Sequence, residues 1–299
     1  MTWDRVERLL GEDVLSFLST QTVGIIGLGS GGSFAAVSLA MSGVGRFILV
    51  DDDSLEPTNV VRHAADRRYL DQLKVDAVAD LIRQRNPAAE IKVVAGRIED
   101  HTDLFDEMDL VVSGVDSEGP KYLINQMCLE HGRTAIYAGV YERGEGGDVC
   151  VIVPGEGPCY ACWAEHLREG LADPGAEPEL DYGMIGPEGT LAAEPGLWLH
   201  VVRIAATQAD LALNELVQNF DVHREMPGNT VVLANTWLEI YEGQTTLPYS
   251  AEWLTIPRNP DCLVCGPKHA QKDSAQVSLD DLISLGQVSY EQDENESSQ

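Results

Sequence analysis

The stretch "TVGIIGLGSGG", residues 22–32, decides the fold class, because a short β-branched strand runs directly into a glycine-rich turn. Gly27, Gly29 and Gly32 have the spacing G-x-G-x-x-G, and the small residues of 31–43 predict a helix. The first glycine permits a tight turn, the second lets the backbone approach a phosphate, and the third lets the helix pack closely on the strand. The stretch therefore predicts a nucleotide-binding turn, and a tight turn that holds no ligand is the alternative.

Strands and helices alternate along the first half of the chain. The strands are predicted at 22–27, 46–50, 91–96, 110–115 and 134–140, and the helices at 31–43, 74–85 and 119–131. This alternation is typical of a parallel sheet with crossover helices, and continuous apolar strands indicate burial on both faces. We therefore expect an α/β fold with a Rossmann-like sheet and helices on both faces.

The second half of the chain follows a different pattern. A strand at 146–154, a long helix at 197–217 and antiparallel strands within 230–243 are predicted. Residues 155–196 are rich in Gly, Pro, Glu and Asp without clear periodicity, which favours a functional loop. The parallel strands are thus expected to continue into antiparallel strands.

The two ends of the chain are also distinctive. Residues 3–20 are predicted to form one amphipathic helix, because apolar residues recur at helical spacing. From about residue 272 the chain carries mainly Asp, Glu, Ser and Gln, which predicts a mostly disordered acidic tail. The expected organisation is one domain over 1–271, with an N-terminal helix within 1–20 and a crossover loop at 155–196, followed by the tail at 272–299.

Composition limits the function classes. The 299 residues carry a formal net charge of −29, which argues against nucleic-acid binding because phosphates repel such a surface. The sequence contains no run of eighteen apolar residues, so no membrane span is expected. The charged N-terminus "MTWDRVERLL" predicts a cytoplasmic protein. The acidic surface is either a solvated shell or a docking surface for a basic protein, and the sequence does not separate the two.

A set of polar residues follows the glycine turn. Asp51 ends the second strand and is placed to accept hydrogen bonds from ribose hydroxyls. Asn59, Arg62 and Lys74 come next, and an arginine fork with a lysine charge suits a triphosphate. Asp116 follows the strand 110–115, at the sheet edge where open α/β sheets bind ligands, and is placed to hold Mg²⁺. The glycine motif by itself favours NAD or FAD, whereas this set favours ATP, although each residue alone could be a surface charge or a turn residue.

Two close cysteine pairs give a metal signal. Cys159 and Cys162 lie in "PCYAC", and Cys262 and Cys265 lie in "PDCLVCG". Four thiolates complete a tetrahedral Zn²⁺ shell with no open position, so a structural zinc site is predicted, which would tie the end of the chain to its middle. An iron–sulfur cluster is the main alternative, with disulfides behind it. The other two cysteines, Cys128 and Cys150, are predicted to be buried small apolar residues.

These elements, in this order, resemble the ThiF/MoeB family of adenylyltransferases, which is related to ubiquitin-activating enzymes. The resemblance covers residues 5–267 and rests on "GLGSGG", "VDDDSLEPTNVVRH", Lys74, "DSEGPK" and the two cysteine pairs. "NVVRH" is similar to the variant in bacterial members linked to ubiquitin-like pathways. The resemblance implies that the chain binds ATP and Mg²⁺. It also implies that the chain adenylates the C-terminal glycine of a small ubiquitin-like or sulfur-carrier protein of β-grasp fold, with release of pyrophosphate.

The resemblance also implies a role for each residue that matches the family pattern. Residues at the turn would face the phosphates, namely Gly27, Gly29, Ser30, Gly31 and Gly32. Asp51, with help from Asp53, would hold the ribose. The triphosphate would be bound by Asn59, Arg62 and Lys74, and Mg²⁺ would be held by Asp116. Since the family is typically homodimeric, Arg5 or Arg8 is expected to reach the site of a partner subunit.

One departure from the family pattern has a chemical consequence. Many relatives carry a cysteine between the two cysteine pairs that accepts the activated protein as a thioester, but this chain has no cysteine between 163 and 261. A thioester needs a thiolate, so a covalent intermediate at that place is excluded. We expect the acyl-adenylate to pass to an external nucleophile, a sulfurtransferase persulfide or the cysteine of a conjugating enzyme.

Other function classes use some of the same features. An NAD-dependent oxidoreductase shares the glycine turn, and a binding scaffold without activity would keep the fold. Within the enzyme class, the carboxylate could belong to a short peptide or to a modified tRNA nucleoside, although the acidic surface opposes tRNA. Exchange of labelled pyrophosphate into ATP distinguishes the adenylating enzyme from the other two classes.

Overall fold

A computed structural model describes residues 3–168, 185–186, 189–190, 197–241 and 243–266. The chain divides into one unit over Met1–Arg258 and a second over Asn259–Gln299, and each is described by itself. The predicted tail at 272–299 and most of the predicted loop at 155–196 lie outside the described residues.

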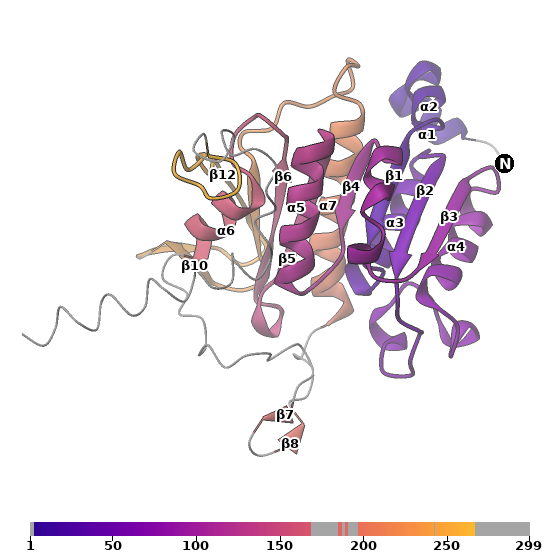
Figure 1. Ribbon diagram of the computed structural model, residues 1–299, viewed down its shortest axis with the longest axis horizontal. Helices are drawn as coiled ribbons and strands as arrows, with labels where there is room; N and C mark the ends of the chain where they lie inside the picture. Colours follow the sequence, from indigo (N-terminus) through magenta and orange to yellow (C-terminus); the bar gives the residue numbers. More distant parts are fainter. Residues whose placement is uncertain (1–2, 169–184, 187–188, 191–196, 242, 267–299) are drawn as a thin grey trace, which may run out of the picture. The chain divides into compact units, whose positions relative to one another are not determined.

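An eight-stranded sheet forms the centre of the first unit, in the order β12-β9-β6-β5-β4-β1-β2-β3 (Figure 1). The strands β3, β2, β1, β4 and β5 are parallel, whereas β6, β9 and β12 pair antiparallel. The bounds are β1 Thr22–Ile26, β2 Arg46–Asp51, β3 Glu90–Ala95, β4 Leu110–Ser113, β5 Thr134–Val140, β6 Gly146–Ile152, β9 Thr230–Ala234 and β12 Ala251–Leu254. The expectation of parallel strands that continue into antiparallel strands is confirmed.

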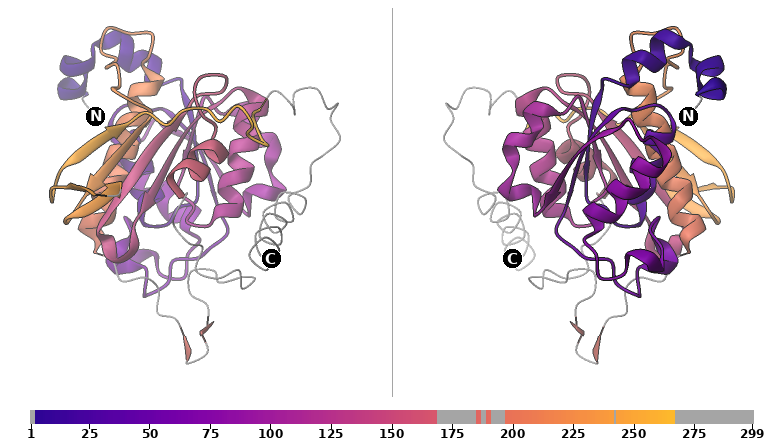
Figure 2. Two further views of the ribbon diagram at one scale, coloured as in Figure 1. Left: turned by 90° about the vertical axis from the view of Figure 1, so that its left-hand side faces the viewer. Right: turned by 90° about the vertical axis from the view of Figure 1, so that its right-hand side faces the viewer.

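Helices cover both faces of this sheet, as Figure 2 shows from two sides. Side chains alternate along the buried strands, so β2 sends Phe47 and Leu49 to one core and Ile48 and Val50 to the other. The first core contains α2, α3, α4 and α7, and the second contains α5 and α6. The bounds are α3 Ser30–Met41, α4 Lys74–Arg85, α5 Glu118–His131, α6 Tyr160–Arg168 and α7 Trp198–Leu216, with short 3-10 helices η1 Val60–Arg62, η2 Arg67–Tyr69, η3 Ile98–Asp100, η4 Thr102–Glu107 and η5 Glu142–Gly144.

The prediction of one helix over 3–20 is wrong. The structure has two helices, α1 Asp4–Leu10 and α2 Glu12–Leu18, with Gly11 between them at φ +91°. A positive φ is compatible with glycine but not with a continuing α-helix. Apolar spacing alone does not reveal such a break, because both helices keep apolar residues at helical intervals.

The prediction of a loop without regular structure over 155–196 is also wrong in part, because α6 lies within it. Helix α6 buries Tyr160 and Trp163, and Asn125 of α5 accepts a hydrogen bond from the Tyr160 N–H at 2.8 Å. Two short strands, β7 Ile185–Gly186 and β8 Gly189–Thr190, pair with each other. The stabilising contacts of α6 come from distant parts of the chain, which local periodicity does not report.

The strands predicted within 230–243 are present and antiparallel, but they do not pair with each other. β9 lies between β6 and β12 in the large sheet. β10 Leu238–Tyr241 instead pairs with β11 Gln244–Thr246 in a separate two-stranded sheet.

Candidate nucleotide site and four-cysteine cluster

The glycine turn connects β1 to α3, and its glycines meet different surroundings. Gly27 has φ +86°, and a Cβ on Gly32 would lie 1.9 Å from the Gly27 carbonyl oxygen. A Cβ on Gly29 would meet no atom within 4 Å. Gly27 and Gly32 are therefore required by the turn itself, whereas the backbone at Gly29 faces open space that a ligand can enter.

The turn lies where the strand order reverses. Ile26, the last residue of β1, pairs with Val50 of β2 on one side and with Ser113 of β4 on the other. All three strands are parallel, so the segments that follow them leave the same edge of the sheet. Ligands of open α/β sheets bind at this point. Asp51, at the end of β2, and Asp116, shortly after β4, lie at this edge.

Asp51 is bonded to the glycine turn. Its Oδ2 atom accepts a hydrogen bond from the Leu28 N–H at 2.6 Å, and its Oδ1 atom accepts one from the Asp53 N–H at 2.9 Å. Burial raises the pKa of the Asp51 carboxyl above its usual value, while the Lys74 ammonium opposes this shift. Asp51 therefore fixes the turn, and the remaining lone pairs of its carboxylate are available to a ribose.

Lys74 begins α4 and is buried at the same edge, with its side chain only 11% exposed. Its Nζ atom lies 2.5 Å from Asp53 Oδ2 and 4.0 Å from Asp51 Oδ1. The carboxylates of Asp51, Asp52 and Asp53 lie within 4.8 Å of one another. Lys74 thus offsets a concentrated negative charge, a pairing that the sequence patterns did not indicate.

Asn59 and Arg62 lie on the segment after β2. Asn59 Oδ1 accepts a hydrogen bond from the Glu56 N–H at 3.0 Å, so its side chain holds its own turn. Arg62 ends η1 and is half-buried. No hydrogen bond or ion pair engages its guanidinium among the described residues. Arg62 is therefore available as a cation for an anionic ligand.

His63 is a site residue that the sequence analysis missed. Its Nε2 atom lies 2.7 Å from the Leu28 carbonyl oxygen, so it connects the Arg62 segment to the glycine turn. The only signal in the sequence is its place directly after Arg62 in "NVVRH".

Asp116, Arg5 and Arg8 stand apart from this network. Asp116 is exposed between β4 and α5, and within the described residues it forms no hydrogen bond or ion pair. Arg8 pairs with Asp4 on exposed α1. Helices α1 and α2 lie at the end of the sheet where β1 and β2 begin (Figure 1), beside a cavity of about 320 Å³ that Trp3 and Gly45 help to line. Arg5 and Arg8 therefore do not join the nucleotide site of their own chain.

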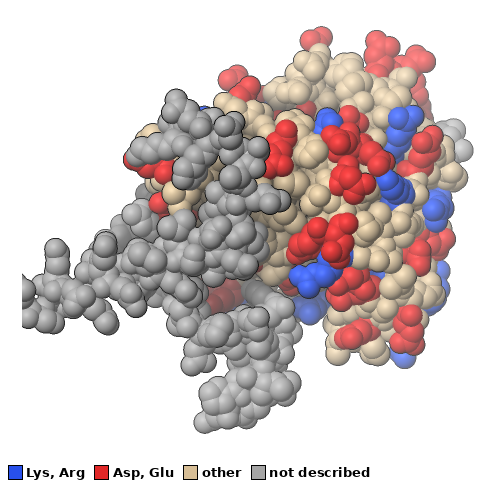
Figure 3. Space-filling view, in the orientation of Figure 1, with Lys and Arg blue, Asp and Glu red and all other residues tan. Residues whose placement is uncertain are grey.

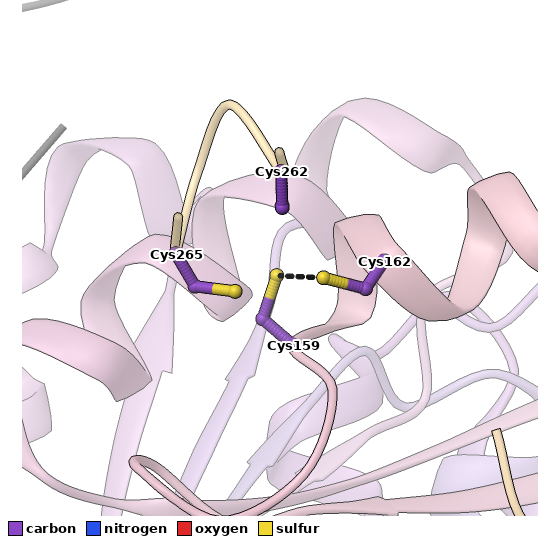
Figure 4. Close-up of side chains that lie close together, drawn as sticks. All are labelled: Cys159, Cys162, Cys262 and Cys265. Atoms are coloured by element: carbon purple, nitrogen blue, oxygen red, sulfur yellow. Dashed lines mark hydrogen bonds between the residues drawn. The ribbon is translucent and has the colours of Figure 1, made fainter. Parts of the chain in front are cut away.

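The cysteine pairs form one cluster, and the prediction that they belong together is confirmed. Cys159 and Cys162 lie at the start of α6, with sulfur atoms 3.7 Å apart. In the second unit, Cys262 accepts a hydrogen bond at its sulfur from the Val264 N–H at 3.4 Å. The sulfur atoms of Cys159, Cys162, Cys262 and Cys265 all lie within 4.8 Å of one another (Figure 4). Four thiols in this arrangement fit a Zn²⁺ ion with a closed tetrahedral shell.

The remaining two cysteines are poor nucleophiles. Cys128 and Cys150 are buried, and burial raises the pKa of both thiols well above the usual value. The prediction that they act as small apolar residues is confirmed by their packing in the second core.

Comparison with known proteins places the chain in a family. The model of the ThiF family matches residues 4–240. The chain belongs to the ThiF family. The SAMP-activating enzyme E1 of Haloferax volcanii is 28% identical over 254 residues, which cover 83% of this chain and 81% of that protein. The ubiquitin-like modifier-activating enzyme 5 of Gallus gallus is 31% identical over 159 residues, which cover 48% of this chain and only 40% of that protein.

Solved structures of Escherichia coli MccB share the fold of this ThiF protein. MccB with ATP superposes with a TM-score of 0.62 at 21% identity, over 85% of this chain and 69% of that chain. MccB with N-formylated MccA superposes with a TM-score of 0.63 at 21% identity, over 85% and 70%. The family and the relatives that are activating enzymes identify the chain as an adenylyltransferase.

The surface agrees with the strongly acidic composition. Acidic side chains are spread over the face in Figure 3, with fewer basic ones among them. Among the described residues, no helix combines the length and the hydropathy that crossing a bilayer requires.

Proposed function

We propose that this ThiF protein uses ATP and Mg²⁺ to adenylate the C-terminal glycine carboxylate of a small ubiquitin-like or sulfur-carrier protein of β-grasp fold. The observation that carries the proposal is the open backbone at Gly29, at the strand reversal, in a turn that is bonded to a carboxylate suited to ribose and, through His63, to the segment of the uncommitted Arg62. A dinucleotide does not require an arginine and a buried lysine beside its phosphates, whereas a triphosphate does.

The proposed reaction develops negative charge on the phosphates of ATP. The carboxylate oxygen attacks the α-phosphorus of ATP, the bond to the β-phosphate oxygen breaks, and pyrophosphate leaves. No protein nucleophile takes part, so catalysis depends on positioning and on stabilisation of the developing charge. In this proposal the turn from Gly27 to Gly32 cradles the phosphates, Asn59, Arg62 and Lys74 stabilise the triphosphate, and Asp116 holds Mg²⁺.

The thiol inventory supports an external acceptor for the acyl group. The chain has six cysteines, of which four form the cluster and two are buried with raised thiol pKa values. None is a free thiolate for a thioester. The acyl-adenylate would instead be attacked by a sulfurtransferase persulfide or the cysteine of a conjugating enzyme, with AMP as the leaving group.

A homodimer would complete the site with Arg5 or Arg8 from the partner subunit. Two features support it. Helix α3 carries no charged residue along "SGGSFAAVSLAM", and exposed apolar side chains such as Met41 and Leu199 lie on α3 and α7, which pack together. Exposed apolar side chains on neighbouring helices are typical of a surface that a partner covers.

Intact-mass spectrometry tests the proposal. The full-length protein is incubated with Mg-ATP and each candidate small protein, and the expected product carries one added AMP. A matched candidate that lacks the terminal glycine should remain unmodified. Addition of AMP to neither form would contradict the proposal, and a reductant-sensitive adduct on the enzyme would contradict the external acceptor.

A short peptide is the second candidate substrate. The shared fold with MccB, solved in complex with N-formylated MccA, motivates this alternative. Peptides with a free C-terminal carboxylate belong in the same mass assay, where AMP addition to the peptide and not to the small proteins would favour this alternative.

A further inference from the structure

The His63 side chain is buried, and both of its ring nitrogens form hydrogen bonds. Nε2 lies 2.7 Å from the Leu28 carbonyl oxygen, and the Ala65 N–H donates to Nδ1 at 2.9 Å. A carbonyl oxygen only accepts and an amide N–H only donates. The ring must therefore be neutral, with its proton on Nε2 and a lone pair on Nδ1.

The same turn residue is held from two sides. The Leu28 N–H donates to Asp51, which ends β2, and the Leu28 carbonyl accepts from His63, which follows η1. A further bond joins the Ala64 N–H to Ser33 of α3 at 3.3 Å. The glycine turn, the aspartate suited to ribose and the Arg62 segment are therefore one connected network, although up to 35 residues separate the bonded pairs.

We propose that neutral His63 is the positioning residue that fixes the glycine turn relative to Arg62 for ATP binding and adenylation. This inference rests on the proposed function. His63 does not contact the reacting atoms in the proposal. It keeps the Leu28 peptide oriented, so that the next backbone N–H groups face the phosphates while the adjacent Arg62 faces the same ligand.

The role of His63 implies a pH dependence with a definite sign. Protonation of Nδ1 would point an N–H at the Ala65 N–H and break that bond, which holds the ring in the orientation from which Nε2–H reaches the Leu28 carbonyl. Loss of this orientation weakens the link to the glycine turn. Burial lowers the pKa of His63 below its usual value of 6.5, and the Lys74 ammonium of α4 lowers it further, while the bond to the Leu28 carbonyl opposes the shift. Arg62 precedes His63 in the chain, and Lys74 itself lies beside two carboxylates, those of Asp51 at the end of β2 and of Asp53. The link is intact above the folded-state pKa and is lost as pH falls through it, below 6.5.

Two substitutions separate bonding from titration. His63→Gln keeps a donor and an acceptor joined through one carbon, as in the ring, but does not titrate. His63→Leu removes both functions and keeps an apolar side chain. Arg67→Ala, on exposed η2, is the matched control in the same segment.

The experiment measures ATP affinity by calorimetry and pyrophosphate exchange with the adenylated substrate, from pH 5 to 8, on full-length protein. We expect the wild type to lose ATP affinity and exchange activity below pH 6.5. His63→Gln should stay within a few-fold of wild type at neutral pH and lose less of either quantity at acid pH. His63→Leu should lose on the order of 100-fold in exchange at every pH. Thermal unfolding at neutral pH checks that each variant is folded.

The outcomes distinguish this inference from the proposed function. An acid limb that persists unchanged in His63→Gln, or a folded His63→Leu with wild-type ATP affinity and exchange, would overturn the role of His63 while leaving adenylation in place. Loss of ATP affinity in His63→Leu and its rescue in His63→Gln, without exchange for any candidate carboxylate, would support His63 and contradict the proposed substrate.

Discussion

The parallel half of the sheet and the antiparallel half hold their polar side chains in different ways. In the parallel half, Asp51, His63 and Lys74 are fixed by hydrogen bonds and ion pairs to groups 21 to 35 residues away. In the antiparallel half, Cys159 and Cys162 follow β6 within one helical turn, and their cluster is completed by the sulfur atoms of Cys262 and Cys265. The geometry of the candidate nucleotide site therefore depends on the position of the backbone groups that hold its side chains. The geometry of the cysteine cluster depends on the presence of its four sulfur ligands.

Loss of one sulfur ligand should have the largest effect on the free energy of unfolding. We expect Cys162→Ser to lower zinc content and to destabilise the protein by more than about 4 kcal/mol, because the structural metal is lost. Metal analysis together with thermal unfolding measures both. The control, Cys128→Ala, should keep its zinc, and retention of full zinc by Cys162→Ser would contradict the closed four-sulfur site.

Removal of the uncommitted cation should change chemistry rather than folding. Arg62→Ala is expected to lower kcat by about 100- to 1000-fold, because charge on the triphosphate develops in the transition state, and to weaken ATP binding much less. Steady-state kinetics and calorimetry measure the two quantities. Arg67→Ala is the control, and equal losses of kcat and ATP affinity in Arg62→Ala would count against the assigned role.

Two glycine substitutions compare the inner and outer sides of the turn. Gly32→Ala forces a Cβ against the Gly27 carbonyl, so we expect a loss of stability of about 1–3 kcal/mol together with weaker ATP binding. Gly29→Ala meets no protein atom within 4 Å, so it should weaken ATP binding and leave stability almost unchanged. Calorimetry and thermal unfolding on both variants test this, and equal stability losses would show that the turn is packed differently.

The smallest expected effect is on the pH dependence of stability. His63 has a lowered pKa in the folded state, so the unfolded chain binds a proton first as pH falls below 6.5, and the free energy of unfolding decreases. The slope from His63 is at most about 1.4 kcal/mol per pH unit. Unfolding of wild type and His63→Gln between pH 5 and 7 should show a shallower slope in the variant, and identical slopes would contradict a buried neutral His63.

The sequence predicted the parallel half well, because its signals are local. Helix α4 was predicted at 74–85 as observed, since Asn86-Pro87 ends it, and the parallel strands are short apolar runs between helices. In the antiparallel half, α6 was missed because its contacts are with residues distant in the chain. The strands within 230–243 were misassigned, because β10 pairs with β11 directly after it rather than with β9.

The candidate site shows the same limit. The positions of Asp51, Arg62 and Lys74 near the turn follow from strand ends and motif spacing. The pairing of Lys74 with Asp53 and the bond from His63 to Leu28 do not, because they depend on how the segment between β2 and α4 folds back on itself and on the glycine turn.

Exchange of labelled pyrophosphate into ATP by the full-length protein tests the central claim most directly, namely that the glycine turn binds a triphosphate for attack by a carboxylate. We expect exchange to require Mg²⁺ and the small protein with its terminal glycine, to be nearly abolished in Arg62→Ala and to be retained in Arg67→Ala. ATP conversion to ADP and phosphate without exchange, or tight binding of a nicotinamide dinucleotide in place of ATP, would contradict the central claim.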